Sequence, residues 1–570
     1  MPGDWFRSLA ALLVFLQPAW ACPNLRQDGT AADAELLATI KTLYQSGQWE
    51  AVTRQISAAS SDSAELDYYK GMALAHLQRW QDANRAFERG ERKVPTDKRF
   101  PLERAGALFK MGSSASAKAC LRRALKLDPQ DSYGREFLAS LYFLEGNLEA
   151  AVQHWNQLGK PAIDEIKMTP LPQLRPDLLD RAFAFAPASL LNVGELRTTQ
   201  AQLDLLEIYP RYRFELLPRK DGVFDLLFTP TEKNGWGDNR FEALLSLLKG
   251  LPYQTVYPEF YNLGKSSLNS LSLVRWDAQK RRFLTCFSGP LGGNPHWRYR
   301  FSLDGRKENW DLTRSFQGAT SANGDLRMQK QSVGAEILNQ WKDRLRWRSA
   351  VDVTHRIFQN PPVVDGNDQL FPHGTSIKYQ TGIDSVLARV PEHRLTTLAF
   401  AGLDFGRMLV IPRTTFAKYQ VGARTQWLPQ ARGDDYAVNA QFRSGTIQGN
   451  PPFDELFMLG IERDNNLWMR AHVGTRDGKK GNSPLGRSYV LFNGEVDKIL
   501  YRHAFFDIKL GPFLDSGKIF DKTGFFGSRE WLWDVGAQAK FRVLEGTTFI
   551  FSYGKDLQTG GNAVYFTVSR

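Results

Sequence analysis

The spacing of apolar side chains changes twice along this chain of 570 residues and divides it into three regions. Between 35 and 160, small and apolar residues recur at helical spacing with a repeat of about 34 residues. The stretch 162–234 mixes short alternating runs with two helical runs, and beyond it only alternating segments of about 8–15 residues remain. The pattern predicts an all-α array, one α/β module and a large antiparallel β-domain.

The first region repeats one set of positions. Each copy has small residues where two helices must approach closely and a large side chain where the next helical pair packs, and the first two copies end on a proline. The positions are Gly71, Ala83, Phe87 and Pro95; Ala105, Ala117, Leu121 and Pro129; and Ala139, Ala151 and Trp155. The pattern resembles the tetratricopeptide repeat, and such arrays usually present a concave face to a partner protein. A rigid spacer is the alternative.

The second region, 162–234, predicts the order strand, helix, helix, strand, strand. Asn192 is a candidate N-cap for a helix over 193–206, because its side-chain oxygen can accept a hydrogen bond from the first turn. Pro-Arg-Lys-Asp-Gly at 218–222 predicts a hairpin turn between the last two strands. The order resembles a POTRA domain, the periplasmic module that precedes certain outer-membrane barrels, although a generic α+β domain fits it too.

The third region, 236–570, divides into 16 alternating segments, the first at 240–248 and the last at 563–568. An even number suits a closed antiparallel membrane barrel, in which every backbone group is paired. A soluble sandwich or propeller is the alternative, but the sequence has no blade-length repeat. Three tryptophans are assigned to the aromatic girdles of such a barrel: Trp297, Trp310 and Trp347.

The N-terminus predicts a secretory signal peptide over 1–21. It has a positive charge at Arg7, an apolar core at 9–16 and an Ala-Trp-Ala cleavage site at 19–21. Cys22 would then be the first mature residue, which leaves its lipidation as a minor option. The net charge of +12 in an exported protein indicates charges in a lumen or contact with anionic lipid rather than binding of nucleic acid.

Near the C-terminus, strand alternation places a charged residue and two motif residues on one face of a predicted strand. Leu510 and Leu514 share one face, whereas Phe513, Asp515 and Gly517 share the other. An aliphatic outer face and a mixed inner face are typical of a transmembrane barrel strand. An arginine that reached such a lumen would pair with carboxylates, because an unpaired charge there is costly.

With these parts in order, the chain resembles the outer-membrane assembly and secretion superfamily, which includes the barrel-assembly insertase and the two-partner-secretion transporters. The residues that carry the resemblance are Gly460, Arg470, Glu495, Phe513, Asp515 and Gly517. The resemblance implies a POTRA domain, a 16-stranded barrel and a loop at 456–487 that folds back into the lumen. Ala471 and His472 depart from the family's glycine and aromatic residue, and Arg570 replaces a terminal aromatic residue.

The resemblance also implies roles for these residues. Arg470, Glu495 and Asp515 are expected to form a buried charge network that fixes the loop. The first and last strands are expected to meet at a weak lateral seam, which would template an incoming strand. The seam residues are Phe241, Ala243, Tyr565 and Phe566. The implied partners are a polypeptide client, periplasmic accessory proteins or chaperones that bind the first two domains, and outer-membrane lipids.

Two other functions remain open. An exopolysaccharide export porin also joins tetratricopeptide repeats to a barrel, and a docking scaffold would use the barrel only as an anchor. An enzyme is not expected, because Gly-Asn-Ser-Pro-Leu-Gly-Arg at 481–487 departs from the nucleophile motif G-x-S-x-G. The eight histidines are dispersed and only three cysteines occur, so neither a cofactor nor a metal site is expected.

Overall fold

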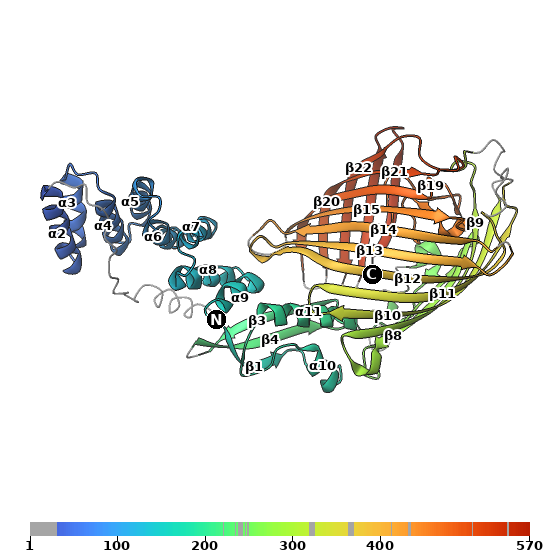
Figure 1. Ribbon diagram of the computed structural model, residues 1–570, viewed down its shortest axis with the longest axis horizontal. Helices are drawn as coiled ribbons and strands as arrows, with labels where there is room; N and C mark the ends of the chain where they lie inside the picture. The colour runs from blue at the N-terminus through green and yellow to red at the C-terminus, as the bar shows by residue number, and fades with distance from the viewer. Residues whose placement is uncertain are drawn as a thin grey trace. The chain divides into compact units, whose positions relative to one another are not determined.

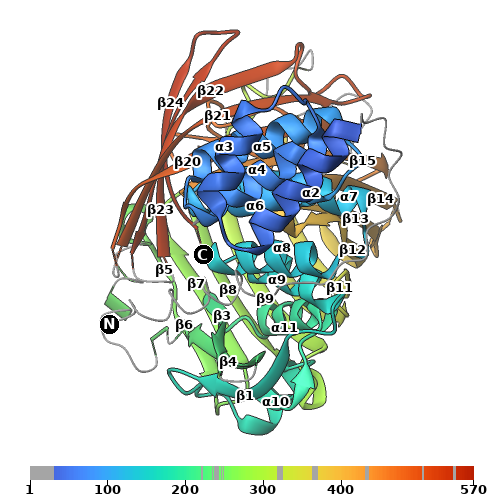
Figure 2. The ribbon, with the colours of Figure 1, turned by 90° about the vertical axis from the view of Figure 1, so that its left-hand side faces the viewer.

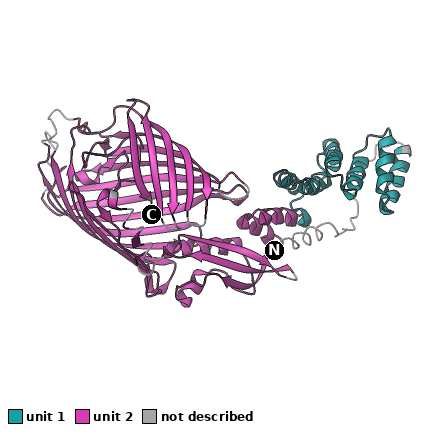
Figure 3. Ribbon diagram, turned by 180° about the vertical axis from the view of Figure 1, so that it is seen from behind, with its two compact units in different colours: residues 1–134 teal, residues 135–570 magenta. Residues whose placement is uncertain are grey.

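The computed structural model describes residues 31–219, 222–233, 235–236, 243–244, 247, 250–317, 325–362, 370–411, 413–430, 435–503, 506–543 and 547–569. The chain divides into two compact units, residues 1–134 and 135–570 (Figure 3). The predicted signal peptide at 1–21 and Cys22 lie outside the described residues.

Paired helices form the N-terminal region (Figure 1). They are α2 (Ala31–Gln45), α3 (Trp49–Ala58), α4 (Ala64–His76), α5 (Trp80–Lys93), α6 (Arg99–Lys110), α7 (Ser114–Leu127), α8 (Ser132–Leu144) and α9 (Leu148–Asn156). The repeated small residues lie where helices touch. A Cβ on Gly71 of α4 would be 2.4 Å from the ring of Phe87, and one on Gly90 of α5 would be 2.1 Å from the ring of Phe100. The predicted helical array is confirmed.

The module that follows holds β1 (Ala162–Met168), α10 (Pro176–Ala182), β2 (Ser189–Leu190), α11 (Val193–Leu206), β3 (Arg211–Pro218) and β4 (Val223–Thr231) (Figure 2). Its sheet has the order β2-β1-β4-β3, with β1 parallel to β4 and β3 antiparallel to it. The side chain of Asn192 accepts a hydrogen bond from the backbone N–H of Gly194 and caps α11, as the sequence predicts. Only the two-residue β2 is absent from the predicted order.

A large antiparallel sheet that curls into a barrel takes up the rest of the chain (Figure 1). Its strands are β5 (Thr255–Val256), β6 (Glu259–Leu263), β7 (Leu268–Trp276), β8 (Lys280–Pro290), β9 (Trp297–Trp310), β10 (Leu326–Trp341), β11 (Leu345–Gln359), β12 (Gly374–Val390), β13 (Leu395–Met408), β14 (Thr415–Trp427), β15 (Tyr436–Gly449), β20 (Ser488–Arg502), β21 (Phe506–Phe520), β22 (Leu532–Val543), β23 (Thr547–Asp556) and β24 (Asn562–Ser569). β15 pairs directly with β20, so residues 450–487 form a loop between neighbouring strands.

The first predicted strand, at 240–248, is wrong. The described residues Ala243 and Leu244 are helical, as is Leu247, and Phe241 lies outside the described residues. The stretch reads Arg-Phe-Glu-Ala-Leu-Leu-Ser-Leu-Leu, with good helix formers and no β-branched residue, so its local preference is for a helix. The other predicted segments each overlap a strand of the structure.

The two faces of the barrel differ in polarity. Large apolar side chains are exposed on its outer face, including Phe283, Phe301, Val333, Val351, Ile383, Val421, Phe442 and Leu510. Val333, for example, is 59% exposed, whereas buried residues of the neighbouring strand β11 include the polar Thr354 and Arg356. A belt of exposed apolar side chains is unfavourable in water and favourable against lipid. No helix among the described residues is both long and apolar enough to cross a membrane.

Trp310 corrects the predicted aromatic girdle. It is buried, and its ring lies 5.0 Å from that of Phe453 in the loop after β15, in an edge-to-face contact. Its indole therefore packs inside the barrel, where it contacts the loop rather than the membrane surface.

Candidate functional site

The segment 450–487, here called the lumen loop, folds into the barrel as a compact structure. It is braced by the short pairs β16 (Phe457–Met458) with β19 (Leu485–Gly486) and β17 (Thr475–Arg476) with β18 (Lys479–Lys480). Gly460 is needed at its centre: a Cβ there would lie 2.0 Å from the Oγ of Ser483 and 2.7 Å from the carbonyl oxygen of His472. The hydroxyl of Ser483 donates to that same carbonyl at 3.1 Å, so the serine of the 481–487 stretch holds the loop together.

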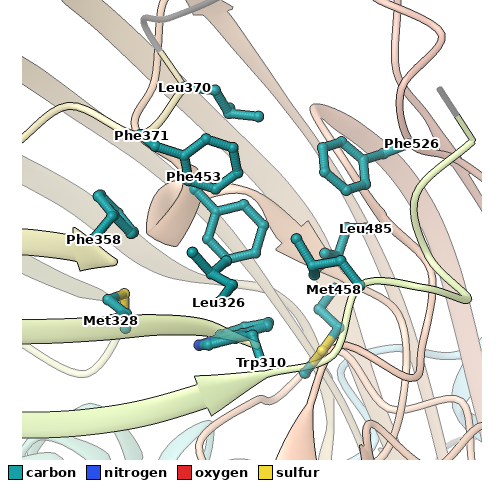
Figure 4. Close-up of a cluster of buried hydrophobic side chains, with 11 residues drawn as sticks. Trp310, Leu326, Met328, Phe358, Leu370, Phe371, Phe453, Met458, Leu485 and Phe526 are labelled. Atoms are coloured by element: carbon teal, nitrogen blue, oxygen red, sulfur yellow. The ribbon is translucent and has the colours of Figure 1, made fainter. Parts of the chain in front are cut away.

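Apolar side chains seat the start and the end of the lumen loop against the wall. Phe453, Met458 and Leu485 from the loop join one buried cluster with side chains of β9, β10 and β11 (Figure 4). A second cluster joins Leu459, Leu467 and Met469 of the loop to Tyr489, Leu491 and Ile519 of β20 and β21. Burial of this much apolar surface makes the folded-in position of the loop favourable.

Arg470 sits at the inner tip of the lumen loop and is 4% exposed. Its Nε and Nη2 donate to the two carboxylate oxygens of Asp515 at 2.9 and 2.7 Å, and its backbone N–H donates to the same carboxylate at 3.0 Å. Its Nη1 donates to Glu495 at 2.9 Å and to the Gln538 side-chain oxygen at 3.0 Å. The guanidinium lies 3.9 Å from the centre of the Phe513 ring. Arg470 thus makes a bidentate, charge-assisted contact in a buried setting.

The sequence-predicted network is therefore assembled in space, with partners that the sequence analysis did not name. Lys540 donates to Glu495 at 2.8 Å and to Asp497 at 2.6 Å, and Asn493 donates to Asp515 at 2.7 Å. These residues lie on β20 and β22, next to the strand that carries Asp515. Alternation of polar residues along each strand could have indicated them, but only the register shows that they meet.

The structure explains why Phe513 and Gly517, the two predicted motif residues of β21, are an aromatic residue and a glycine. Phe513 forms the floor beneath Arg470, and directly opposite it on β22 is Gly536, where a Cβ would lie 2.6 Å from the Phe513 ring. Gly517 leaves room for the loop, since a Cβ there would lie 3.2 Å from Leu459. Gly554 of β23 does the same for the loop tip, because its Cβ would lie 2.7 Å from the carbonyl oxygen of Arg470.

A row of three aspartates crosses the wall beneath the loop tip. Asp515 of β21 is directly opposite Asp534 of β22, which is directly opposite Asp556 of β23. Like charges in directly opposed positions are destabilising unless they are neutralised. Arg470 neutralises the first aspartate, and the two residues after it meet the second: the N–H of Ala471 donates to Asp534 at 2.6 Å, and Nδ1 of His472 is 3.0 Å from it. The departures from the family pattern at 471–472 therefore contact this row.

The other side of the barrel binds the acidic residues of the lumen loop. Asp454 pairs with Arg356 at 3.0 Å and with Lys330 at 2.8 Å, and Glu455 pairs with Lys378 at 2.9 Å. These cations come from β10, β11 and β12. The predicted loop boundary at 456 excludes this pair of acids, whereas in the structure they belong to the loop.

A third set of ion pairs holds the middle of the lumen loop to β7 and β8. Asp464 pairs with Arg275 at 2.9 Å and with Arg282 at 2.7 Å. Lys480 of β18 pairs with Glu308 of β9 at 2.7 Å and with Asp464 at 3.3 Å. The loop is thus fixed by acids toward β7–β12 and by Arg470 toward β20–β22. The sequence indicates only the Arg470 side of this division, because the register that brings the acids to their cations is not a local pattern.

The predicted seam residues fall at different places. Tyr565 and Phe566 lie on β24, the last strand, whereas Ala243 is helical and so does not form the opposite edge. The hydroxyl of Tyr253, just before β5, donates to the carbonyl oxygen of Phe566, and the two rings stack with centroids 5.9 Å apart. Among the described residues, the paired backbone positions of β24 lie on β23, and the strand order places β5 on its other side. The contact between Tyr253 and Phe566 lies at this edge.

A comparison with protein families supports the helical repeats. Residues 102–161 match the tetratricopeptide repeat family. The N-terminal helices are tetratricopeptide-like repeats. A comparison with curated proteins finds no match.

Solved structures similar to this chain include the following three. BamA from Haemophilus ducreyi lacking POTRA domains 1–3 is 10% identical at a TM-score of 0.40, covering 72% of this chain and 84% of that one. CdiB from Escherichia coli is 14% identical at a TM-score of 0.45, covering 72% and 76%. CdiB from Acinetobacter baumannii is 10% identical at a TM-score of 0.40, covering 81% and 86%.

Proposed function

We propose that this protein is a 16-stranded outer-membrane barrel that inserts polypeptides into the membrane or translocates them across it. The observation that carries the proposal is the lumen loop, whose Arg470 is fixed on Asp515 and Glu495 inside the barrel. Among the described residues, the paired backbone positions of β24 lie on β23, and its other side contacts Tyr253. A lumen filled by the loop and a weakly joined edge are suited to a client that enters at the barrel wall rather than through an open pore. The apolar outer face supports a place in a lipid bilayer.

The mechanism needs no chemical step. The edge of β24 carries backbone N–H and C=O groups that a barrel with a complete ladder would pair. An extended client segment could pair with these groups as an added strand, which is β-augmentation. Separation of the edges would break the hydrogen bond and the ring stacking between Tyr253 and Phe566, and would leave the ladders of the other strands in place.

The domains before the barrel would receive the client in the periplasm, with 162–234 as a POTRA-like module. The last repeat helix, α9, is attached to the turn between β12 and β13: the side chain of Asn147 donates to the carbonyl oxygen of Pro391 at 2.8 Å, and His154 is 2.9 Å from Glu392. Glu149 of the same helix accepts from Arg197 of α11 at 2.6 Å. These contacts support attachment of the last repeat helix to the barrel and to α11.

Cross-linking the edges tests the proposal. In a chain with Cys22, Cys120 and Cys286 replaced by serine, Tyr253→Cys and Phe566→Cys are joined by a short cleavable thiol cross-linker. The purified protein is placed in liposomes and given two probes: an unfolded outer-membrane barrel polypeptide, followed by protease protection, and a secreted polypeptide, followed by its uptake into the vesicles. We expect the uncross-linked protein to act on at least one of the two probes. The bridge is expected to abolish that activity, and cleavage of the cross-linker is expected to restore it.

A matched control uses the same residue on β24. Phe551→Cys on β23 with Phe566→Cys joins two strands that are already paired, with ring centroids 4.6 Å apart. This bridge is expected to leave activity unchanged. Full activity with the Tyr253–Phe566 bridge in place would refute the opening of this edge. An ion conductance that falls on addition of an acidic polysaccharide, with no activity on either polypeptide, would support the export porin instead.

A further inference from the structure

The charges beneath the tip of the lumen loop do not balance. Arg470 and Lys540 pair with Asp515, Glu495 and Asp497 of β20 and β21. Beyond them lie Asp534 and Asp556, and among the described residues neither has a lysine or arginine within ion-pair distance. Two buried carboxylates without a cation are costly, so their neighbourhood calls for a positive charge.

The hydrogen bonds of the two aspartates leave one atom without a donor. Asp534 is fully buried, and its Oδ2 accepts from the N–H of Ala471, but its Oδ1 accepts no hydrogen bond within the described residues. Asp556 is held at the end of β23 by the N–H of Gln558 and the hydroxyl of Thr559, both neutral donors. Within the part of the chain that the structure describes, the side chain that lies near both carboxylates is the imidazole of His472.

The imidazole faces a carboxylate with each of its nitrogens. The hydrogen bond of Nδ1 goes to Oδ2 of Asp534 at 3.2 Å, and Oδ1 of the same carboxylate lies 3.0 Å from Nδ1 without hydrogen-bond geometry. Nε2 is 3.7 Å from Oδ2 of Asp556. If the ring is neutral and donates its Nδ1–H to Asp534, Nε2 carries a lone pair that points at an oxygen of Asp556. Two hydrogen-bond acceptors then face each other, which is unfavourable. A separation of 3.7 Å is close to that of two ligands on one metal ion, each bonded at about 2.0–2.2 Å.

We propose that His472 and Asp556 bind a divalent transition-metal ion of the Zn²⁺ class at the tip of the lumen loop. Asp534 then acts as the carboxylate that fixes the imidazole through Nδ1, the arrangement found behind most metal-bound histidines, and its Oδ1 is available as a third oxygen. Candidate ligand atoms of the three side chains all lie within 4.8 Å of one another. Because His472 comes from the loop and Asp556 from β23, the ion would cross-link the loop to the wall.

Metal titration of the full-length protein in detergent tests this site independently of any transport activity. The protein is stripped with EDTA, exchanged into chelator-free buffer at pH 7.5, and titrated with Zn²⁺ by calorimetry and with Co²⁺ by absorption spectroscopy. We expect one equivalent to bind with micromolar affinity or tighter, with cobalt bands that indicate nitrogen and oxygen ligands. Absence of a saturable single equivalent would overturn the proposal and assign the positive charge to a protonated His472.

Variants distinguish the proposed metal ligands from the residue that supports them. His472→Gln, His472→Phe and Asp556→Asn are each expected to abolish the tight equivalent, whereas Asp534→Asn is expected to weaken it about 10–100-fold, the usual effect of losing a supporting carboxylate. The control, His503→Gln, removes an exposed histidine far along the chain and is expected to bind like the parent. Unchanged affinity in folded His472→Gln, checked by heat-modifiable gel mobility, would refute the site.

Discussion

Replacing Arg470 by alanine is the sharpest test of how the lumen loop is held. The variant removes the cation from Asp515, which is fully buried, and from Glu495. Glu495 retains Lys540 and the Gln538 amide, whereas Asp515 retains only neutral donors, the Asn493 amide and the backbone N–H of residue 470. The cost therefore falls mainly on Asp515.

The size of the effect follows from this difference. Removal of one partner of a buried ion pair leaves a charge in a low-dielectric site and costs about 3–5 kcal/mol. Asp515→Asn removes the surplus charge, so the double variant Arg470→Ala with Asp515→Asn is expected to be less destabilised than the sum of the single variants by about 2 kcal/mol or more. Asp534 provides the contrast, because Asp534→Asn does not touch Arg470 and is not expected to rescue it.

Equilibrium unfolding in urea, with the protein in detergent micelles, measures these free energies. Arg476→Ala serves as the control, since this loop arginine is half-exposed and pairs with the exposed Asp477. Surface pairs of that kind contribute about 0–1 kcal/mol. An Arg470→Ala variant within 1 kcal/mol of the parent, or single variants whose costs simply add, would refute a direct buried pairing.

Three further variants test other parts of the structure. Glu455→Gln removes the charge that meets Lys378 and is expected to cost about 1–3 kcal/mol in the same urea assay. Val333→Lys on the outer face is expected to destabilise the barrel in phospholipid vesicles by about 2–4 kcal/mol, while Val333→Leu is neutral. Burial raises the pKa of Glu103 on α6 from 4.5 to about 7, so this carboxyl ionises at a lower pH in the unfolded chain than in the folded one. The stability of the repeats is therefore expected to fall as the pH rises through this range. Glu103→Gln is expected to reduce this loss of stability. Thermal unfolding at pH 5 and pH 8, followed by the helical circular dichroism signal, measures it; an equal loss in the variant would contradict the prediction.

Local patterns in the sequence predict much of this molecule. Helical spacing and repeated small residues determine the array, because each helix pair packs mainly on its sequence neighbours. Strand alternation predicts which side chains of β21 face the lumen, since the side-chain period is two along any strand. The same reasoning failed at Ala243, Leu244 and Leu247, where leucines fit both an alternating and a helical pattern and helix propensity favours the helix.

The rest depends on register, which no local pattern contains. Asp515, Asp534 and Asp556 are far apart in the sequence, and only the pairing of three strands aligns them in one row. A shift of one residue in either pairing would turn an aspartate to the outer face. The inward position of Trp310 depends in the same way on the contact that it makes with Phe453 of the lumen loop.

The distribution of charge explains why the lumen loop adopts one placement. Its acids Asp454 and Asp464 meet cations of β7–β11, and its tip cation, Arg470, meets the aspartate row of β20–β23. Lys480 lies on the cationic side but is neutralised there by Glu308. A loop turned the other way would place its acids against the aspartate row, and like charges that close in a poorly solvated lumen repel strongly. Apolar burial alone tolerates several placements, whereas this pattern of signs selects one. Movement of the loop therefore requires several ion pairs to break together, so its release is expected to be all-or-none.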